Sequence, residues 1–125
     1  MEYERRVEFD WIRRPDGTSE FEEFLDSLPA KDAAKLLAVI SATEASGLQA
    51  AIRMQWVKKL EDGLYELRSR QGGDIQRAVY FHVAKTSYMI THAFTKKSPK
   101  TPHREIEHAA RLRDRYWKER ADEQD

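Results

Sequence analysis

The hydrophobic pattern near the N-terminus predicts one strand followed by two helices. Val7, Phe9 and Trp11 alternate with charged residues, which is the period-two pattern of a half-buried strand. Apolar residues then recur at helical spacing in residues 21–28 and again in residues 33–40. Because the connection between these stretches is short, we expect a helical hairpin that packs as one layer.

The second half of the chain has the pattern of a sheet built from hairpins. Runs rich in β-branched and aromatic residues are separated by short turn signals, and they occupy residues 56–60, 64–70, 75–84 and 87–97. A last helix is predicted to start with Thr101 as its N-cap and Pro102 at its first position. Helices segregated from a hairpin-connected sheet indicate an α+β fold: an N-terminal strand, a helical hairpin, a four-stranded and mostly antiparallel sheet, and a C-terminal helix.

Length and composition narrow the class of protein. The 125 residues fit a single domain over residues 1–121, followed by a frayed tail at residues 122–125. The chain has no cysteine, which removes disulfides, thiolate nucleophiles and cysteine-based zinc sites. It has no signal-peptide pattern and no run of 18 apolar residues. We expect a soluble, cytoplasmic protein that does not contact membranes and needs neither a metal nor a cofactor.

The charged residues are distributed unevenly along the chain, which the net charge does not reveal. Lysines and arginines number 22, as do aspartates and glutamates, so the formal net charge is zero. Between positions 67 and 104, however, 8 basic residues stand against 1 acidic residue, Asp74. A local cluster of this kind is typical of a surface that binds phosphates.

The segments "GLYELRSR", "IQRAVYFHV" and "MITHAFTKKSPKTP" resemble the RelE/ParE superfamily of bacterial toxins, most closely its HigB-like, phage Gp49-like branch. The resemblance implies the toxin of a type II toxin–antitoxin pair. Many such toxins cleave messenger RNA on the ribosome without a metal, and a helix-turn-helix, HigA-like antitoxin silences them. The ParE branch shares the fold but inhibits DNA gyrase through protein binding, so both functions stay open at this point.

The resemblance also assigns roles to residues. Arg77 matches the strand arginine that contacts the scissile phosphate in the ribonuclease members, and Lys97, with Lys96 beside it, matches a basic residue after the next strand. The remaining candidates for RNA binding are Arg68, Arg70, Lys100 and Phe94. Arginine suits a phosphate because its guanidinium stays charged and donates two parallel hydrogen bonds.

The general acid and base stay open. The two lysines that RelE carries at the start of a strand are replaced here by Leu64 and Glu66. Glu66 and His92 are therefore candidates, and His92 has the unperturbed pKa that suits proton transfer. His103 and His108 are five residues apart, which does not suit a shared metal, and we expect both on the surface.

Strand alternation separates the candidates into faces. His92, Phe94 and Lys96 are expected on one face of their strand and Lys97 on the other. Lys97 is favoured by the resemblance, and Lys96 is favoured if His92 is catalytic. The opposing interpretation is that the lysines only keep a sheet edge soluble and that Arg68 and Arg77 form structural ion pairs.

Overall fold

The computed structural model describes residues 6–96 and 100–123. Four helices and five strands follow one another along this part of the chain: β1 (Glu8–Trp11), α1 (Glu20–Ser27), α2 (Ala30–Ser46), α3 (Leu48–Arg53), β2 (Val57–Lys59), β3 (Leu64–Gln71), β4 (Asp74–Ala84), β5 (Ser87–Lys96) and α4 (His103–Glu123). The α+β class predicted from the sequence is confirmed.

The sheet has five strands in the order β1-β5-β4-β3-β2, whereas the sequence predicted a four-stranded sheet and a separate N-terminal strand. Strands β2 to β5 are antiparallel neighbours joined by hairpins, as expected. Strand β1 adds to β5 in parallel, with Phe9 opposite Tyr88, so the sheet is mixed. Its pairing partner lies almost 80 residues away in the sequence, and no local pattern announces such a contact.

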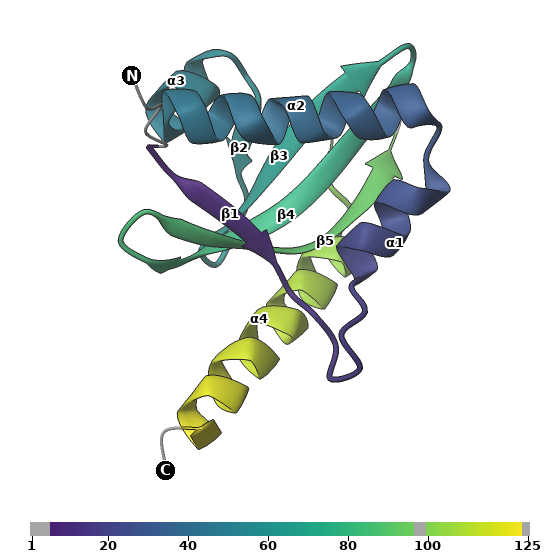
Figure 1. Ribbon diagram of the computed structural model, residues 1–125. Coiled ribbons are helices and arrows are strands. Elements are labelled where there is room, and N and C mark those ends of the chain that lie inside the picture. The colour runs from purple at the N-terminus through teal and green to yellow at the C-terminus, as the bar shows by residue number, and fades with distance from the viewer. Residues whose placement is uncertain (1–5, 97–99, 124–125) are drawn as a thin grey trace, which may run out of the picture.

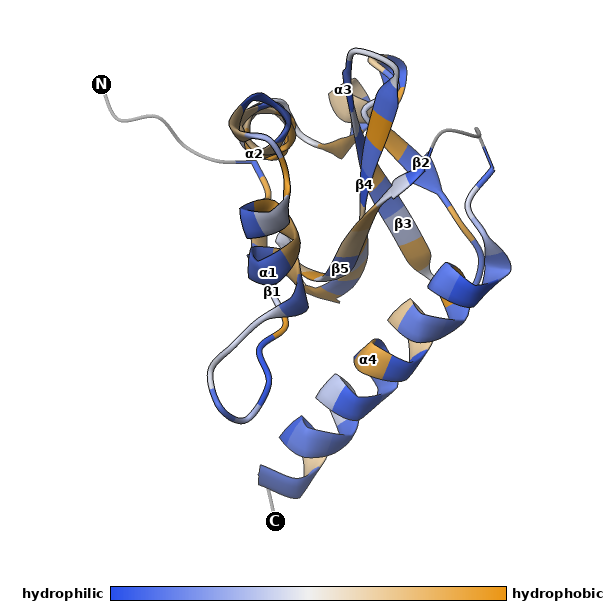
Figure 2. Ribbon diagram, turned by 90° about the vertical axis from the view of Figure 1, so that its right-hand side faces the viewer, coloured by the Kyte–Doolittle hydropathy of each residue, from blue (hydrophilic) through white to orange (hydrophobic). Residues whose placement is uncertain are grey.

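Helices cover the two faces of the sheet separately (Figures 1 and 2). Helices α1 and α2 lie on one face, and α4 lies on the other and extends beyond the sheet toward the C-terminus. Each face has its own apolar cluster. Phe21, Leu36 and Tyr80 lie in the cluster under α1 and α2, while Val79 and Ala109 lie in the cluster under α4. The side under α4 is the one that matters for the candidate site.

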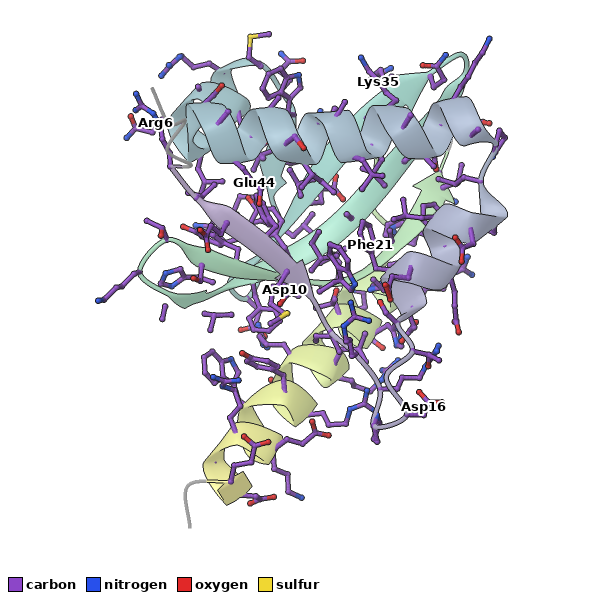
Figure 3. All side chains as sticks on the ribbon, viewed as in Figure 1. Arg6, Asp10, Asp16, Phe21, Lys35 and Glu44 are labelled. Carbon is purple, nitrogen blue, oxygen red and sulfur yellow. The ribbon has the colours of Figure 1, made fainter. Side chains whose placement is uncertain are left out.

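Local signals explain where the first helices begin and end. The Ser19 hydroxyl accepts a hydrogen bond from the backbone N–H of Glu22, which caps α1. Phe21, one residue into the helix, is fully buried and points toward the sheet (Figure 3). Gly47 separates α2 from α3 with a φ of 88°, a value that glycine adopts without strain.

One helix was not predicted, and another has boundaries that differ from the sequence prediction. Helix α3 (Leu48–Arg53) lies between the predicted helices and strands, in residues to which the sequence prediction assigned no element. Helix α4 begins at His103, and the carbonyl of Pro102 accepts hydrogen bonds from the N–H groups of Glu105 and Ile106. Thr101 is therefore not the N-cap that the sequence predicted, because its side chain is used elsewhere. Helix α4 reaches Glu123, two residues into the predicted tail.

Among the described residues, no helix combines the length and the apolar character needed to cross a membrane.

Candidate nucleic-acid interface

Strand register places most of the predicted site residues on one side of the sheet. Arg68 of β3 lies opposite Arg77 of β4, which in turn lies opposite Phe94 of β5. Two residues further toward the end of the sheet, Ile75 of β4 lies between Arg70 of β3 and Lys96 of β5. Directly paired residues point to the same side of a sheet. We call Arg68, Arg70, Arg77, Phe94 and Lys96 the basic face.

Arg77 lies in the interior of the domain, next to Thr101, which comes just before helix α4. Its side chain is fully buried, and its Nη1 donates a hydrogen bond of 3.0 Å to Thr101 Oγ1. The same hydroxyl donates a hydrogen bond of 2.6 Å to Glu66 Oε2, and Glu66 Oε1 lies 3.8 Å from Arg77 Nη1. Thr101 thus bridges a buried ion pair, and this arrangement predicts that Arg77 meets a phosphate only when Thr101 moves away.

Electrostatics at Arg77 show how dense the positive charge is. Burial lowers the pKa of the Arg77 guanidinium, the carboxylate of Glu66 opposes that shift, and the charges of Arg68 and Arg70 lower the pKa further. The charges of three guanidinium groups therefore act on one another at this end of the sheet. An anion that approaches such a cluster is attracted to it and lowers its electrostatic free energy.

The other cations of the site are more accessible than Arg77. Arg70 and Lys100 are exposed, while Arg68 and Lys96 are partly buried. None of the ion pairs among the described residues involves Arg68, Arg70 or Lys96, so the structural pairing considered for Arg68 is absent from that part of the chain. Lys97, the lysine that the resemblance favours, lies outside the described residues.

His92 shares a side of the sheet with Glu66 and is almost completely buried. The β4–β5 register shifts after Val79, and Thr91 falls at the irregularity, with its hydroxyl bonded to the Val79 carbonyl. His92 Nδ1 lies 3.1 Å from the Thr91 hydroxyl, and the ring stacks against Phe94 with centroids 5.8 Å apart. Sequence alternation correctly placed His92 and Phe94 on a common face.

The surroundings of His92 contain groups that the sequence did not connect to it. Burial lowers the pKa of His92, nearby His108 lowers it further, and Glu105 and Glu20 oppose the shift. His108, expected on the surface, is half-buried, contacts the His92 ring and lies 2.9 Å from Glu20 Oε1. His103 is exposed, as expected. The helix periodicity of α4 alone gave no signal for the contact between these histidines, because it depends on how the helix sits on β5.

Two further residues of the site were missed in the sequence. Thr101 has the hydroxyl that joins Arg77 to Glu66, although its sequence context resembles a helix cap. Lys58 lies opposite Glu66 in the edge strand β2 and is exposed, so it adds a cation beside the basic face. No cluster of three or more histidine, aspartate or glutamate side chains arranged to hold a metal ion occurs in residues 6–96 and 100–123.

A helical hairpin on one side of a mostly antiparallel sheet, with a basic face on the other, agrees with the architecture that the resemblance to RelE/HigB-like toxins implied. Residues 23–114 match the phage-derived Gp49-like protein family (DUF891), and the chain belongs to this family of RelE/HigB-like toxins. Membership points to the toxin side of a toxin–antitoxin pair and to an antitoxin as partner. No curated protein matches the chain at a significant level.

Proposed function

We propose that this protein is the toxin of a type II toxin–antitoxin pair and that it inhibits translation by cleaving messenger RNA on the ribosome. The observation that supports this proposal most directly is the basic face, where cations from three neighbouring strands share one side of the sheet. A HigA-like helix-turn-helix antitoxin is the partner that the resemblance implies.

The proposed reaction needs three kinds of help from the protein. The ribose 2′-hydroxyl must lose a proton, the pentavalent phosphorus transition state must be stabilised, and the leaving 5′-oxygen must gain a proton. Fixed positive charges near the phosphate usually contribute the largest share of such a rate enhancement. The residues of the basic face supply fixed charges of this kind without any bound ion.

We assign the cations to two positions. Arg70 and Lys100, which are exposed, and Lys96, which is partly buried, bind the RNA backbone. Arg77 is held behind them by Glu66 and Thr101, and it stabilises charge at the scissile phosphate once the RNA has displaced Thr101. Lys97 keeps the catalytic role that the resemblance implies. Phe94, which lies opposite Arg77 in β5, offers a ring on which a base stacks.

His92 is the proton-transfer group that we propose. Because burial lowers its pKa, the imidazole is neutral near pH 7 and is able to accept a proton. Its position one row from Arg77 on the same side of the sheet supports the assignment. Glu66 has a different task in this scheme, since its carboxylate is fully buried and faces Arg77. We propose that it orients the arginine.

Primer extension on cellular messenger RNA during induced expression tests the proposal. The wild-type chain should stop growth and create new 5′ ends, while Arg70→Ala or Lys96→Ala should lower the frequency of cleavage. Arg77→Ala should lower it roughly a hundredfold, the usual effect of removing one charge-stabilising donor. Lys118→Ala, an exposed change in the last part of α4, is the control.

Growth arrest without new 5′ ends, with Arg77→Ala still toxic, would contradict the ribonuclease proposal. A gyrase supercoiling assay on the purified chain then tests the ParE-like alternative, in which the basic face only docks a protein.

A further inference from the structure

A hollow opens at the edge of the sheet beside the basic face, on the side of helix α2. It encloses about 270 Å³ between α2, the connection from α3 to β2, and the end of β3. Its lining residues are Lys35, Val39, Met54, Gln55, Trp56, Arg68, Ser69 and Arg70. We call it the edge hollow, and Figure 3 labels Lys35 at its α2 wall.

The edge hollow is positively charged. Lys35, Arg68 and Arg70 all line it, and none of its lining residues is acidic. Within the described part of the chain, none of these three cations forms an ion pair with a carboxylate. Arg68 and Arg70 point to the opposite side of β3 from Ser69, so Lys35 is the lining cation on the Ser69 side, and its charge attracts an anion that enters the hollow.

A buried polar group in the wall also lacks a partner. Ser69 lines the hollow with only 3% of its surface exposed, and its hydroxyl has no hydrogen-bond partner among the described residues. Buried hydroxyls are usually bonded, and an orphan in the wall of a hollow is explained when a ligand completes the bond. Trp56, half-buried beside it, adds a flat aromatic wall.

We propose that the edge hollow is a subsite for one nucleotide of single-stranded RNA, which places its phosphate beside Lys35 and the Ser69 hydroxyl and its base against Trp56. This inference rests on the proposed ribonuclease function. Arg68 and Arg70 belong both to the basic face and to the hollow, so an RNA strand on the face reaches the hollow by passing over the end of β3. Aromatic rings beside cations are the usual platform for single-stranded nucleic acids.

The size of the edge hollow favours a nucleotide over a protein segment. Small-molecule pockets enclose roughly 300 to 1,000 Å³, and the hollow, at about 270 Å³, lies just below that range. One base with its phosphate fills such a space. An acidic segment of a protein partner would satisfy the cations but would leave the aromatic wall without a matching surface.

Titrations followed by the backbone amide signals of Met54, Gln55 and Ser69 test the inference on the full chain. The probes are adenosine 5′-monophosphate, adenosine, inorganic phosphate, a six-nucleotide single-stranded RNA and an acidic hexapeptide. We expect saturable shifts with the monophosphate and tighter saturation with the RNA, and at most weak shifts with adenosine or phosphate alone. Lys35→Ala should weaken binding about tenfold and Ser69→Ala about threefold.

Lys31→Ala is the matched control, since Lys31 is exposed one turn away on α2 and does not line the hollow. The inference is overturned if the monophosphate and the RNA leave these amides unchanged, if Lys35→Ala binds like the control, or if only the acidic peptide binds. The last outcome would make the hollow a protein-docking surface. Primer extension with Lys35→Ala distinguishes the subsite from the ribonuclease function. If Lys35→Ala cleaves messenger RNA and binds RNA as well as the wild-type chain does, the subsite proposal alone is contradicted. If the wild-type chain binds RNA without cleaving it, the ribonuclease proposal alone is contradicted.

Discussion

Arg77 is a charged side chain in the interior of the domain, and Glu66 and Thr101 stabilise its charge there. Glu66 supplies the opposite charge, and Thr101 connects the pair by accepting from Arg77 and donating to Glu66. Removing one member of a buried ion pair leaves the other charge uncompensated, which is far more destabilising than replacing both by apolar groups.

Glu66→Ala is therefore expected to lower the free energy of unfolding by about 3–5 kcal/mol. Thr101→Val, which removes only the bridging hydroxyl, should cost about 1–3 kcal/mol. Chemical denaturation of both variants measures these differences. The double variant Glu66→Leu/Arg77→Met should be more stable than Glu66→Ala alone. A loss below about 1 kcal/mol in Glu66→Ala would show that the pair is not the structural unit described above.

His92 makes stability depend on pH. Its pKa in the folded protein lies below the ordinary value of 6.5, because burial and nearby His108 disfavour the charged ring. The unfolded chain then binds the proton more readily than the folded one. The contribution to stability is present above about pH 6.5, the ordinary histidine pKa, and is lost as the pH falls through the lower folded pKa.

Denaturation midpoints measured between pH 7.5 and pH 5 check this prediction. The stability of His92→Gln should depend less on pH in this range than that of the wild-type chain. His103→Gln, at an exposed histidine, should keep the wild-type slope. His108→Gln should give an intermediate slope, since it removes one cause of the shift while Glu105 and Glu20 remain. Identical slopes in the wild-type and His92→Gln chains would contradict the assignment.

The residues also show why part of the site was predictable. Alternation along a strand is a local property, and it placed His92, Phe94 and Lys96 on one side before any contact was known. The bridge through Thr101 was not predictable, because it joins residues 24 and 35 positions away in the sequence. The irregularity at Thr91 likewise depends on pairing with β4.

At the scale of elements, strand β1 is one of the two edge strands of the sheet. It has four residues, pairs with β5 on one side only and forms the edge of the sheet. Glu44 of α2 holds its other side: the Phe9 N–H donates to Glu44 Oε2 at 2.9 Å, and the Glu44 carbonyl accepts from Arg6 and Val7 (Figure 3). This helix-to-strand contact has no pattern in the sequence, which explains why the sequence predicted β1 apart from the sheet.

Glu44→Ala is expected to loosen β1 and to lower the free energy of unfolding by about 1–3 kcal/mol, because the Phe9 N–H loses its acceptor. Amide hydrogen exchange at Phe9 should accelerate more than exchange in the central strand β4. Glu44→Gln keeps a side-chain oxygen at the same place and serves as the control. Equal protection of the Phe9 amide in the Ala variant and the wild-type chain would show that the β5 pairing alone holds β1.

At the scale of the whole molecule, opposite charges are sorted onto different regions even though the net charge is zero. The cations of the basic face and of the edge hollow gather at one end of the sheet, whereas α1 carries three glutamates in its first turn. A chain without net charge is not drawn to nucleic acid as a whole. We therefore expect the affinity for RNA to come mainly from this end, and the dependence of binding on salt concentration reports how many phosphates it contacts.

Single-stranded RNA loses about 0.7 of a logarithmic unit of affinity per contacted phosphate for each tenfold rise in salt. Three or four contacts at this end of the sheet predict a slope of roughly −2 to −3 in a plot of log K against log salt. Arg70→Ala should reduce the magnitude of that slope by about 0.7 and weaken binding to every sequence alike, since a phosphate contact does not read bases. Lys118→Ala should leave the slope unchanged. Fluorescence anisotropy with a labelled RNA between 50 and 300 mM salt measures it, and a wild-type slope near zero would mean that the sorted charges bind something other than the RNA backbone.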